Sequence, residues 1–435
     1  MIDRISEGLL VVASKISNQR HMSAIKNAFT ALLPIIIAGA FCTLFSNVVC
    51  STTTEGISLA KLPGMSWLEL LTPMFNAANY ATLNFMTIGV VILISLEHGR
   101  YFNRKEFITP VIAVASFVSL CTTSASTTVE GLADPVVIAN VLPREFTNAQ
   151  GLFLGMITAL VSVEIYCRLA NSGKFKIKMP DSVPPNVAGT FELLIPAVLT
   201  ILIISGFGMV FQYITSYTIS EAINALIQAP LTGLLTGLPG YLLIFGLSTI
   251  FWVIGIHGTN VLKPVYQATT LQAILANTEA VTNGQEPQYI LNDTFISCFT
   301  TCGGAGCTIG LIVALLIFSK RDDYQAIAKL SILPGVFNIN ETITFGLPVV
   351  LNPIMAIPFI IAPIVSASFA YFMTSIGFCG IMTYAVPWTT PPLLIAWLGT
   401  GGNIGAVITQ FICIVLSFFV YLPFVIISNR QNNKA

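Results

Sequence analysis

Glu341 is an ionisable residue in surroundings where a charge is expensive. It is the only Asp, Glu, Lys, Arg or His between Lys329 and Arg430, and its nearest polar neighbours are Asn338 and Asn340, with glycines and a proline close by. A carboxylate among apolar segments of this kind usually faces a polar cavity and marks a substrate or ion path. The sequence therefore predicts a binding site here, on an irregular or re-entrant segment at membrane depth.

His257 is the second such residue. Between Ala222 and Thr278 only His257 and Lys263 can carry a charge near neutral pH. A neutral imidazole both donates and accepts a hydrogen bond, which suits a sugar hydroxyl. Two structural alternatives stay open. The histidine could be an interfacial residue bonded to a backbone carbonyl, and the carboxylate of Glu341 could cap helix donors inside the fold.

Five further residues are candidates for ligand contacts. Trp252 and Trp388 flank the two candidate segments, and their rings could stack on a sugar, although an interfacial aromatic belt explains either one taken singly. Asn186 and Gly189 follow a double proline and could offer polar groups at a helix start, where a plain N-cap fits equally well. Arg100 is most simply a cytoplasmic basic residue, and a ligand role for it is the minority hypothesis.

Composition defines the class of protein that must hold these residues in place. Of 435 residues 55% are hydrophobic and 9% are charged, and the mean hydropathy is +0.83, whereas soluble domains carry about 25% charged residues. The chain is therefore expected to be an all-α polytopic membrane protein. Its nine cysteines are scattered without a CxxC pair, and no nucleotide-binding loop occurs. No metal, cofactor or nucleic-acid partner is expected.

Apolar runs long enough to cross a bilayer are frequent along the chain. They cover residues 28–49, 74–96, 107–123, 150–169, 191–213, 241–262, 302–319, 353–375 and 404–428, with a weaker run at 216–237. Shorter apolar pieces broken by glycine and proline lie at 331–350 and 378–400.

The basic residues orient these runs. With the N-terminus inside, sixteen of the nineteen Lys and Arg residues fall on one side, and only Lys61, Arg144 and Lys263 fall on the other. By the positive-inside rule both termini are predicted to be cytoplasmic. This pattern requires the run at 216–237 to cross, which predicts about ten transmembrane helices and two re-entrant hairpins in the C-terminal half. Met1–Lys26 is predicted to form an amphipathic helix on the membrane surface.

The linker Asn171–Ala188 is the clearest internal boundary. It carries a cluster of lysines followed by Pro180, Pro184 and Pro185, which a helix would not continue through. We therefore predict an N-terminal half, residues 1–175, with conventional spans. The C-terminal half, residues 176–435, holds the broken segments.

Three motifs together carry a family resemblance. They are residues 255–260 (Gly-Ile-His-Gly-Thr-Asn), 338–341 (Asn-Ile-Asn-Glu) with 344–348 (Thr-Phe-Gly-Leu-Pro), and 178–187 (Lys-Met-Pro-Asp-Ser-Val-Pro-Pro-Asn-Val). On these motifs the chain resembles the IIC membrane component of the bacterial phosphoenolpyruvate-dependent sugar phosphotransferase system, in its lactose, cellobiose and diacetylchitobiose family. The resemblance covers essentially the whole chain.

The resemblance implies a homodimer of ten-span subunits in the bacterial cytoplasmic membrane. The N-terminal half would build the dimer interface and the C-terminal half would bind the sugar. By carry-over His257 and Glu341 hold a β-linked disaccharide of the cellobiose or diacetylchitobiose class. By similarity, the further contacts are Asn186, Gly189, Trp252, Trp388 and Arg100, with Asn340 beside the carboxylate. The acidic Glu192 in the stretch after Asn186 departs from the family pattern, which leaves the sugar specificity open.

The resemblance also implies the chemistry. A phosphocysteine on a soluble IIB protein would pass its phosphoryl group to the 6-hydroxyl of the sugar at the cytoplasmic face, with Glu341 as a base or as a group that orients that hydroxyl. The chain has no IIB-like extension, so the donor is expected on a separate protein. The alternative class is an ion-coupled secondary sugar transporter with Glu341 or His257 as its protonation site.

Overall fold

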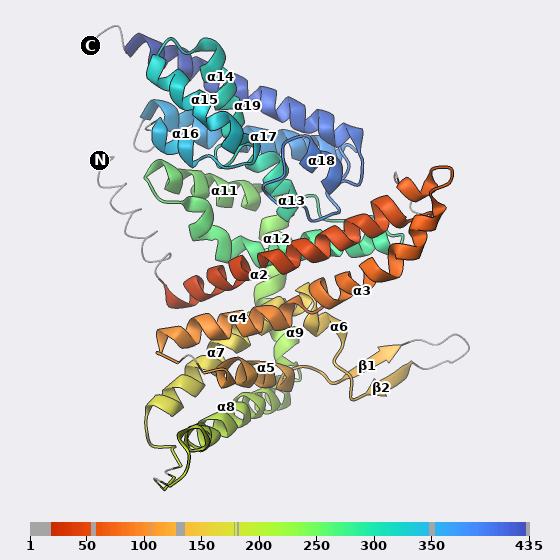
Figure 1. The fold of residues 1–435 in the computed structure, drawn as a ribbon, viewed down its shortest axis with the longest axis vertical. Helices are drawn as coiled ribbons and strands as arrows, with labels where there is room; N and C mark the ends of the chain where they lie inside the picture. The colour runs from red at the N-terminus through yellow and green to blue at the C-terminus, as the bar shows by residue number, and fades with distance from the viewer. Residues whose placement is uncertain are drawn as a thin grey trace. The chain divides into compact units, whose positions relative to one another are not determined.

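The structure, a computed structural model, describes residues 19–53, 58–104, 106–127, 135–177, 179–180, 182–347 and 353–431. Within them the chain is mainly helical, with one two-stranded antiparallel sheet (Figure 1). The helices are α2 (Arg20–Phe45), α3 (Thr72–Leu83), α4 (Met86–Tyr101), α5 (Ile108–Ser119), α6 (Arg144–Thr147), α7 (Leu152–Asn171), α8 (Pro185–Thr215), α9 (Ile219–Ile223), α10 (Ala229–Thr236), α11 (Leu238–Val253), α12 (Gly258–Thr282), α13 (Asp293–Phe295), α14 (Thr308–Phe318), α15 (Asp322–Val336), α16 (Glu341–Gly346), α17 (Pro353–Ser375), α18 (Leu394–Gly399) and α19 (Ile404–Gln431). The strands are β1 (Ser124–Thr127) and β2 (Val136–Ala139), with Ser124 opposite Ala139.

Long apolar helices identify a membrane protein. By length and composition, the described residues contain six helices that could each cross a bilayer. The number is seven if the pair Ile219–Thr236 and Leu238–Val253, bent by 84°, is one span. The expected all-α polytopic class is thus confirmed, whereas the count of ten spans stays a prediction. The predicted surface helix over Met1–Lys26 lies mostly outside the described residues.

The helices divide into two compact units. The unit called here the N-terminal unit comprises Asn18–Ile36 and Tyr80–Pro230, and the C-terminal unit includes Ile37–Asn79 and Leu231–Ala435. This division is one of packing. The predicted halves, residues 1–175 and 176–435, concern roles in assembly and transport, and they stay a prediction.

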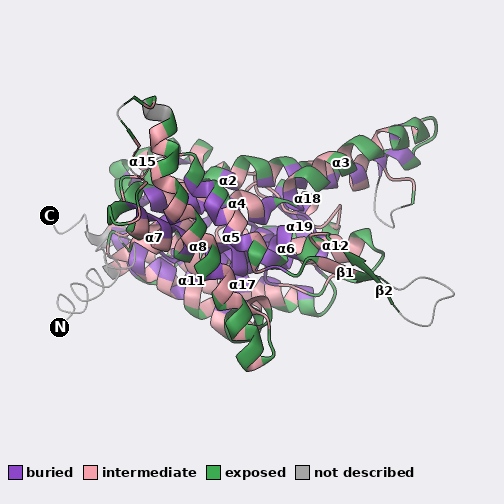
Figure 2. Ribbon diagram, turned by 90° about the horizontal axis from the view of Figure 1, so that it is seen from below, coloured by how far each residue is buried: buried purple, intermediate pink, exposed green. Residues whose placement is uncertain are grey.

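Straight, closely packed helices form the N-terminal unit. Helices α4, α5 and α7 pack on one another and bury apolar residues such as Val90, Ile94 and Phe117. Gly155 in α7 permits the close approach to α4, because a Cβ there would come within 2.8 Å of the Thr87 side chain. The strand β2 lies outside this packing and exposes all four of its residues (Figure 2).

An ionic network joins three helices of the N-terminal unit. Its centre is Glu164 on α7, which lies 3.0 Å from Arg20 of α2 and 3.1 Å from His98 of α4. Arg168, one turn along α7, completes it at 2.6 Å. This i,i+4 pair is the one that the sequence spacing predicts. The side chain of His98 is fully buried, whereas Arg20 and Arg168 are 28% and 67% exposed, so the network runs from the packed interior to the surface of the unit.

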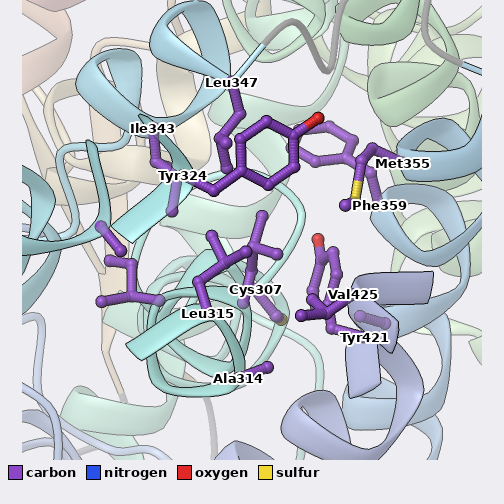
Figure 3. Packing of buried hydrophobic residues seen from close by; sticks show 14 of the residues in the cluster. Cys307, Ala314, Leu315, Tyr324, Ile343, Leu347, Met355, Phe359, Tyr421 and Val425 are labelled. Atoms are coloured by element: carbon purple, nitrogen blue, oxygen red, sulfur yellow. The ribbon is translucent and has the colours of Figure 1, made fainter. Parts of the chain in front are cut away.

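Helices α14, α15, α17 and α19 build the core of the C-terminal unit. Their buried residues form one cluster, which includes Leu315, Tyr324 and Phe359 (Figure 3). Ile343 of the short helix α16 and Leu347 directly after it belong to this cluster. Burial of these two side chains anchors the helix that begins at Glu341.

Two of the predicted spans are interrupted. The apolar run 241–262 is not one helix, because α11 ends at Val253 and α12 begins at Gly258. The run 302–319 is α-helical only over Thr308–Phe318, and Gly303, Gly304 and Gly306 before it all have positive φ. Hydropathy measures how apolar a segment is and does not report its backbone dihedrals, so these breaks escaped the sequence pattern.

Candidate functional site

His257 lies in the break between α11 and α12. Gly255 turns the chain there with φ of +87°, a conformation that favours glycine. Gly258 starts α12 in direct contact with α11, where a Cβ would lie 1.8 Å from the carbonyl oxygen of Ser248. The Nδ1 atom of His257 accepts a hydrogen bond of 3.2 Å from the backbone N–H of Asn260 and so caps α12. A neutral ring with Nδ1 as acceptor carries its hydrogen on Nε2.

That Nε2 atom faces the carboxylate of Glu341. The two atoms, Nε2 of His257 and Oε1 of Glu341, are 3.9 Å apart, which is too long for a direct hydrogen bond. The side chains are 39% and 51% exposed, respectively. Glu341 occupies the first position of α16, where a helix dipole favours negative charge. The residue before it, Asn340, makes no side-chain cap bond at that helix start.

The ring of Trp252 contacts the imidazole of His257. The two ring centroids are 4.2 Å apart, and the indole N–H donates to the Thr259 hydroxyl at 3.1 Å. Trp252 is only 2% exposed. Its face therefore packs on His257, and a stacking contact with a ligand stays a prediction for this residue.

Trp388 is much more accessible than Trp252. It is 44% exposed and lies in the irregular segment between α17 and α18. Its carbonyl oxygen accepts a 2.6 Å hydrogen bond from the side-chain amide of Asn338. The Trp388 segment is thereby tied to the segment that carries Glu341.

Asn340 is buried directly before Glu341. Its Nδ2 donates to the carbonyl oxygen of Ala305 at 2.7 Å, and it packs so closely on Gly304 that a Cβ there would come within 2.6 Å. In this conformation Asn340 anchors the loop. Its predicted contact with a ligand is not tested by this geometry.

The remaining predicted residues belong to the N-terminal unit. Arg100, near the end of α4, is 62% exposed on its side chain and pairs with Glu97. Gly189 lies in α8 with open space around it. Asn186 is in the first turn of the same helix, and its side chain lies outside the described part of the chain. The structure thus brings five of the eight predicted residues into one unit, and the part of the other three in the site stays a prediction.

Sequence analysis missed the supports of the site. Residues 301–307 form an irregular, glycine-rich loop whose backbone bonds to Asn338, Asn340 and Tyr421. The sequence showed Asn338 as a polar neighbour of Glu341 and as part of the motif 338–341, but indicated no role for it in the site. In the structure, Asn338 itself has a positive φ. The glycines at 303, 304 and 306 were the one signal in the sequence that could have indicated the loop 301–307.

One group among the described residues has metal-ligand spacing. The nearest ligand atoms of His21, His98 and Glu164 lie within 4.8 Å of one another. However, Glu164 already binds Arg20 and Arg168, and two guanidinium groups beside a carboxylate oppose a cation there. Nδ1 of His21 also accepts from the Gln19 amide at 2.7 Å, since the oxygen of that amide is used by Met22. The geometry favours an ionic network over a metal centre.

Comparison with known proteins identifies the family. Residues 26–363 match the family "Phosphotransferase system, EIIC". The chain is 32% identical to the oligo-beta-mannoside-specific EIIC component of Bacillus subtilis (strain 168), over 99% of this chain and 95% of that protein. It is 30% identical to the lichenan permease IIC component of the same strain, over 99% and 94% of the two chains.

A solved structure agrees with these relatives. The crystal structure of the transporter ChbC, the IIC component from the N,N'-diacetylchitobiose-specific phosphotransferase system, matches with a TM-score of 0.89 and 32% identity. The match covers 97% of this chain and 96% of that one. The resemblance predicted from the three motifs is confirmed. The chain belongs to the phosphotransferase system EIIC family and is a multi-pass sugar permease component of that system.

Proposed function

We propose that this permease translocates a β-linked disaccharide of the cellobiose or diacetylchitobiose class and presents its 6-hydroxyl to phospho-IIB at the cytoplasmic face. The names of its relatives support this class of sugar, since they refer to lichenan, oligo-beta-mannosides and N,N'-diacetylchitobiose. The IIB protein would carry the phosphocysteine, and phosphorylation would trap the sugar inside the cell.

The 3.9 Å gap between His257 and Glu341 is the observation that carries the proposal. A sugar hydroxyl between them could accept from Nε2–H and donate to the carboxylate, with both bonds near the usual length of about 2.8 Å. A bond to a charged group is worth about 1.5–3 kcal/mol. Both side chains are accessible enough to receive such a ligand.

Other predicted residues complete the proposed site. The half-exposed ring of Trp388 offers a face for stacking on a sugar ring. Asn340 and Trp252 would contribute through the positions of Glu341 and His257 as well as by any direct contact. By the family resemblance, Asn186, Gly189 and Arg100 are also part of this proposal as ligand contacts.

The proposed architecture has ten spans and two re-entrant hairpins, over 331–350 and 378–400. Both termini would be cytoplasmic, residues 1–175 would form the scaffold and interface of a homodimer, and residues 176–435 would carry the sugar. The basic-residue asymmetry supports this orientation. Labelling of single cysteines by an impermeant reagent in intact cells tests the topology, and light scattering of the purified protein tests the dimer.

Uptake of labelled cellobiose and diacetylchitobiose by membrane vesicles tests the function. We expect accumulation of sugar phosphate that depends on IIB and is unaffected by an uncoupler. Accumulation of unmodified sugar that disappears with the proton gradient would instead support the ion-coupled transporter.

The role of Glu341 in the phosphoryl transfer needs a separate experiment. The variant Glu341→Gln keeps the shape and removes the charge. If the variant binds sugar but phospho-IIB no longer phosphorylates that sugar, the carboxylate acts as the base for the 6-hydroxyl. If binding and phosphorylation fall together, Glu341 is a binding residue only.

A further inference from the structure

Asn338 connects three segments that are far apart in the sequence. Its Oδ1 accepts from the backbone N–H of Gly303 at 2.7 Å. Its Nδ2 donates to the carbonyl oxygens of Trp388 at 2.6 Å and of Thr390 at 3.3 Å. The residue is 7% exposed, so its amide is largely shielded from solvent.

We infer that Asn338 is a positioning residue, which sets where Glu341 stands relative to Trp388. This inference rests on the proposed function of those two side chains. Glu341 follows Asn338 by three residues, and Trp388 supplies the carbonyl that Asn338 holds. One side-chain amide thus connects the segment that carries Glu341 to the Trp388 segment and to the glycine-rich loop 301–307.

The backbone at Asn338 explains why an asparagine stands here. Its φ is +60°, in the left-handed region, which Gly, Asn and Asp adopt more readily than other residues do. Gly would accept this conformation but has no amide, whereas Asp has the acceptor but lacks the donor. Asn satisfies both requirements.

These differences provide two variants with separate meanings. Asn338→Gly keeps the backbone conformation and removes all three bonds. Asn338→Asp keeps an acceptor for Gly303 and removes the bonds to Trp388 and Thr390, whose carbonyls then face a carboxylate. Asn338→Asp therefore releases the Trp388 segment selectively.

The matched control is Asn429, another amide that clamps backbone in the same unit. Its Oδ1 accepts from Lys320 N–H at 2.8 Å, and its Nδ2 donates to the Phe318 carbonyl at 2.9 Å. These partners belong to neither segment of the proposed site. Asn429→Ala should lower the melting temperature without changing the affinity for sugar.

The first test measures binding of cellobiose and diacetylchitobiose to the purified full-length protein by calorimetry. For both Asn338 variants we expect the Kd to rise by about tenfold to a hundredfold, because a displacement of about 1 Å in a binding constellation can have an effect of that size. In double-mutant cycles, Asn338→Asp should be non-additive with Trp388→Phe. Asn429→Ala should be additive with it.

The second test reports position and does not depend on binding. The chain has four tryptophans, so 5-fluorotryptophan labelling allows each ¹⁹F signal to be followed. In Asn338→Asp we expect the Trp388 signal to shift or sharpen while the signal of Trp67 stays unchanged. A loss of stability alone would not move the Trp388 signal of the folded protein.

The outcomes separate this inference from the proposed function. If Glu341→Ala and Trp388→Ala bind sugar as well as the unaltered protein, the proposed site is wrong. If those variants bind poorly while Asn338→Asp binds normally and its Trp388 signal is unchanged, the positioning role is overturned. If Asn338→Gly does not fold, Asn338→Asp and the ¹⁹F signal still decide the question.

Discussion

Two carboxylates of this membrane protein, Glu164 and Glu341, have opposite surroundings. Glu164 in the N-terminal unit is bound by Arg20, Arg168 and His98 at 3.0, 2.6 and 3.1 Å, and its side chain is 19% exposed. Glu341 in the C-terminal unit has a 51% exposed side chain. Its one ionic neighbour among the described residues is His257 at 3.9 Å.

This difference separates a structural carboxylate, Glu164, from one that we propose binds a ligand, Glu341. The bonding capacity of Glu164 is met by groups of its own chain, which ties α2, α4 and α7 together. Among the described residues, Glu341 has His257 as its neighbour of opposite character, and its half-exposed side chain agrees with the proposed role in binding sugar. Sequence spacing already indicated a pair of Glu164 with Arg168, four residues on, whereas it offered Glu341 no such partner.

Removal of Glu164 is expected to have the largest effect on stability. Glu164→Ala leaves the buried Nε2 of His98 without its acceptor and two partly exposed arginines without their carboxylate, which together costs about 2 kcal/mol. A lower melting temperature in detergent would show this, with unchanged sugar affinity in the folded fraction. Glu192→Gln is the control, because its pair with Lys176 at 3.0 Å is exposed and worth about 1 kcal/mol or less. If both changes lowered the melting temperature equally, Glu164 would be no more important for stability than an exposed ion pair.

Glu341→Gln should show the reverse pattern. We expect unchanged melting, because no bond within the described chain depends on this carboxylate. Sugar affinity should fall by about 2 kcal/mol, close to thirtyfold, since a bond to a charged group is lost. Calorimetry and thermal melting on the same sample check both values. Substantial destabilisation with unaltered affinity would place Glu341 in the same structural class as Glu164.

His257 allows its capping role and its ligand role to be separated. His257→Asn keeps a good N-cap for α12 but shortens the side chain that faces Glu341, so binding should weaken about tenfold while stability is retained. His257→Ala should lose binding to the same degree and about 1 kcal/mol of stability as well. If both variants bind sugar normally, the imidazole serves only as a cap.

Asp323 should have the smallest effect. A hydrogen bond from the Arg321 side chain lowers the pKa of this carboxyl below its ordinary value. The pair therefore stabilises the fold above about pH 4, and this contribution is lost as pH falls through the lowered pKa. Since the Asp323 side chain is 56% exposed, Asp323→Asn should change stability by about 0.5 kcal/mol or less at pH 7. Melting curves of both proteins should run parallel from pH 5 to 8, and a divergence there would contradict this assignment.

Local sequence patterns were more useful for selecting candidate site residues than for predicting the course of the backbone. Glu341 and His257 could be picked out because a charged or titratable residue in an apolar run is unusual in any fold. The breaks at Val253 and before Thr308 could not be seen in hydropathy, because glycine-rich apolar segments are as apolar as helical ones. Asn338 was undervalued for another reason: its partners lie 35 and 50 residues away in the chain.

The sequence by itself determined the class of the protein and the family, and it singled out His257 and Glu341 as candidate site residues. These follow from composition and motifs, which are local properties and do not depend on how distant segments meet. Only the tertiary structure showed that Arg20 and His98 join Arg168 around Glu164, that the Glu341 side chain is half exposed, and that one amide of Asn338 joins the two segments of the proposed site. Hydrogen bonds depend on distance and direction between atoms from separate segments, and only the folded chain sets those.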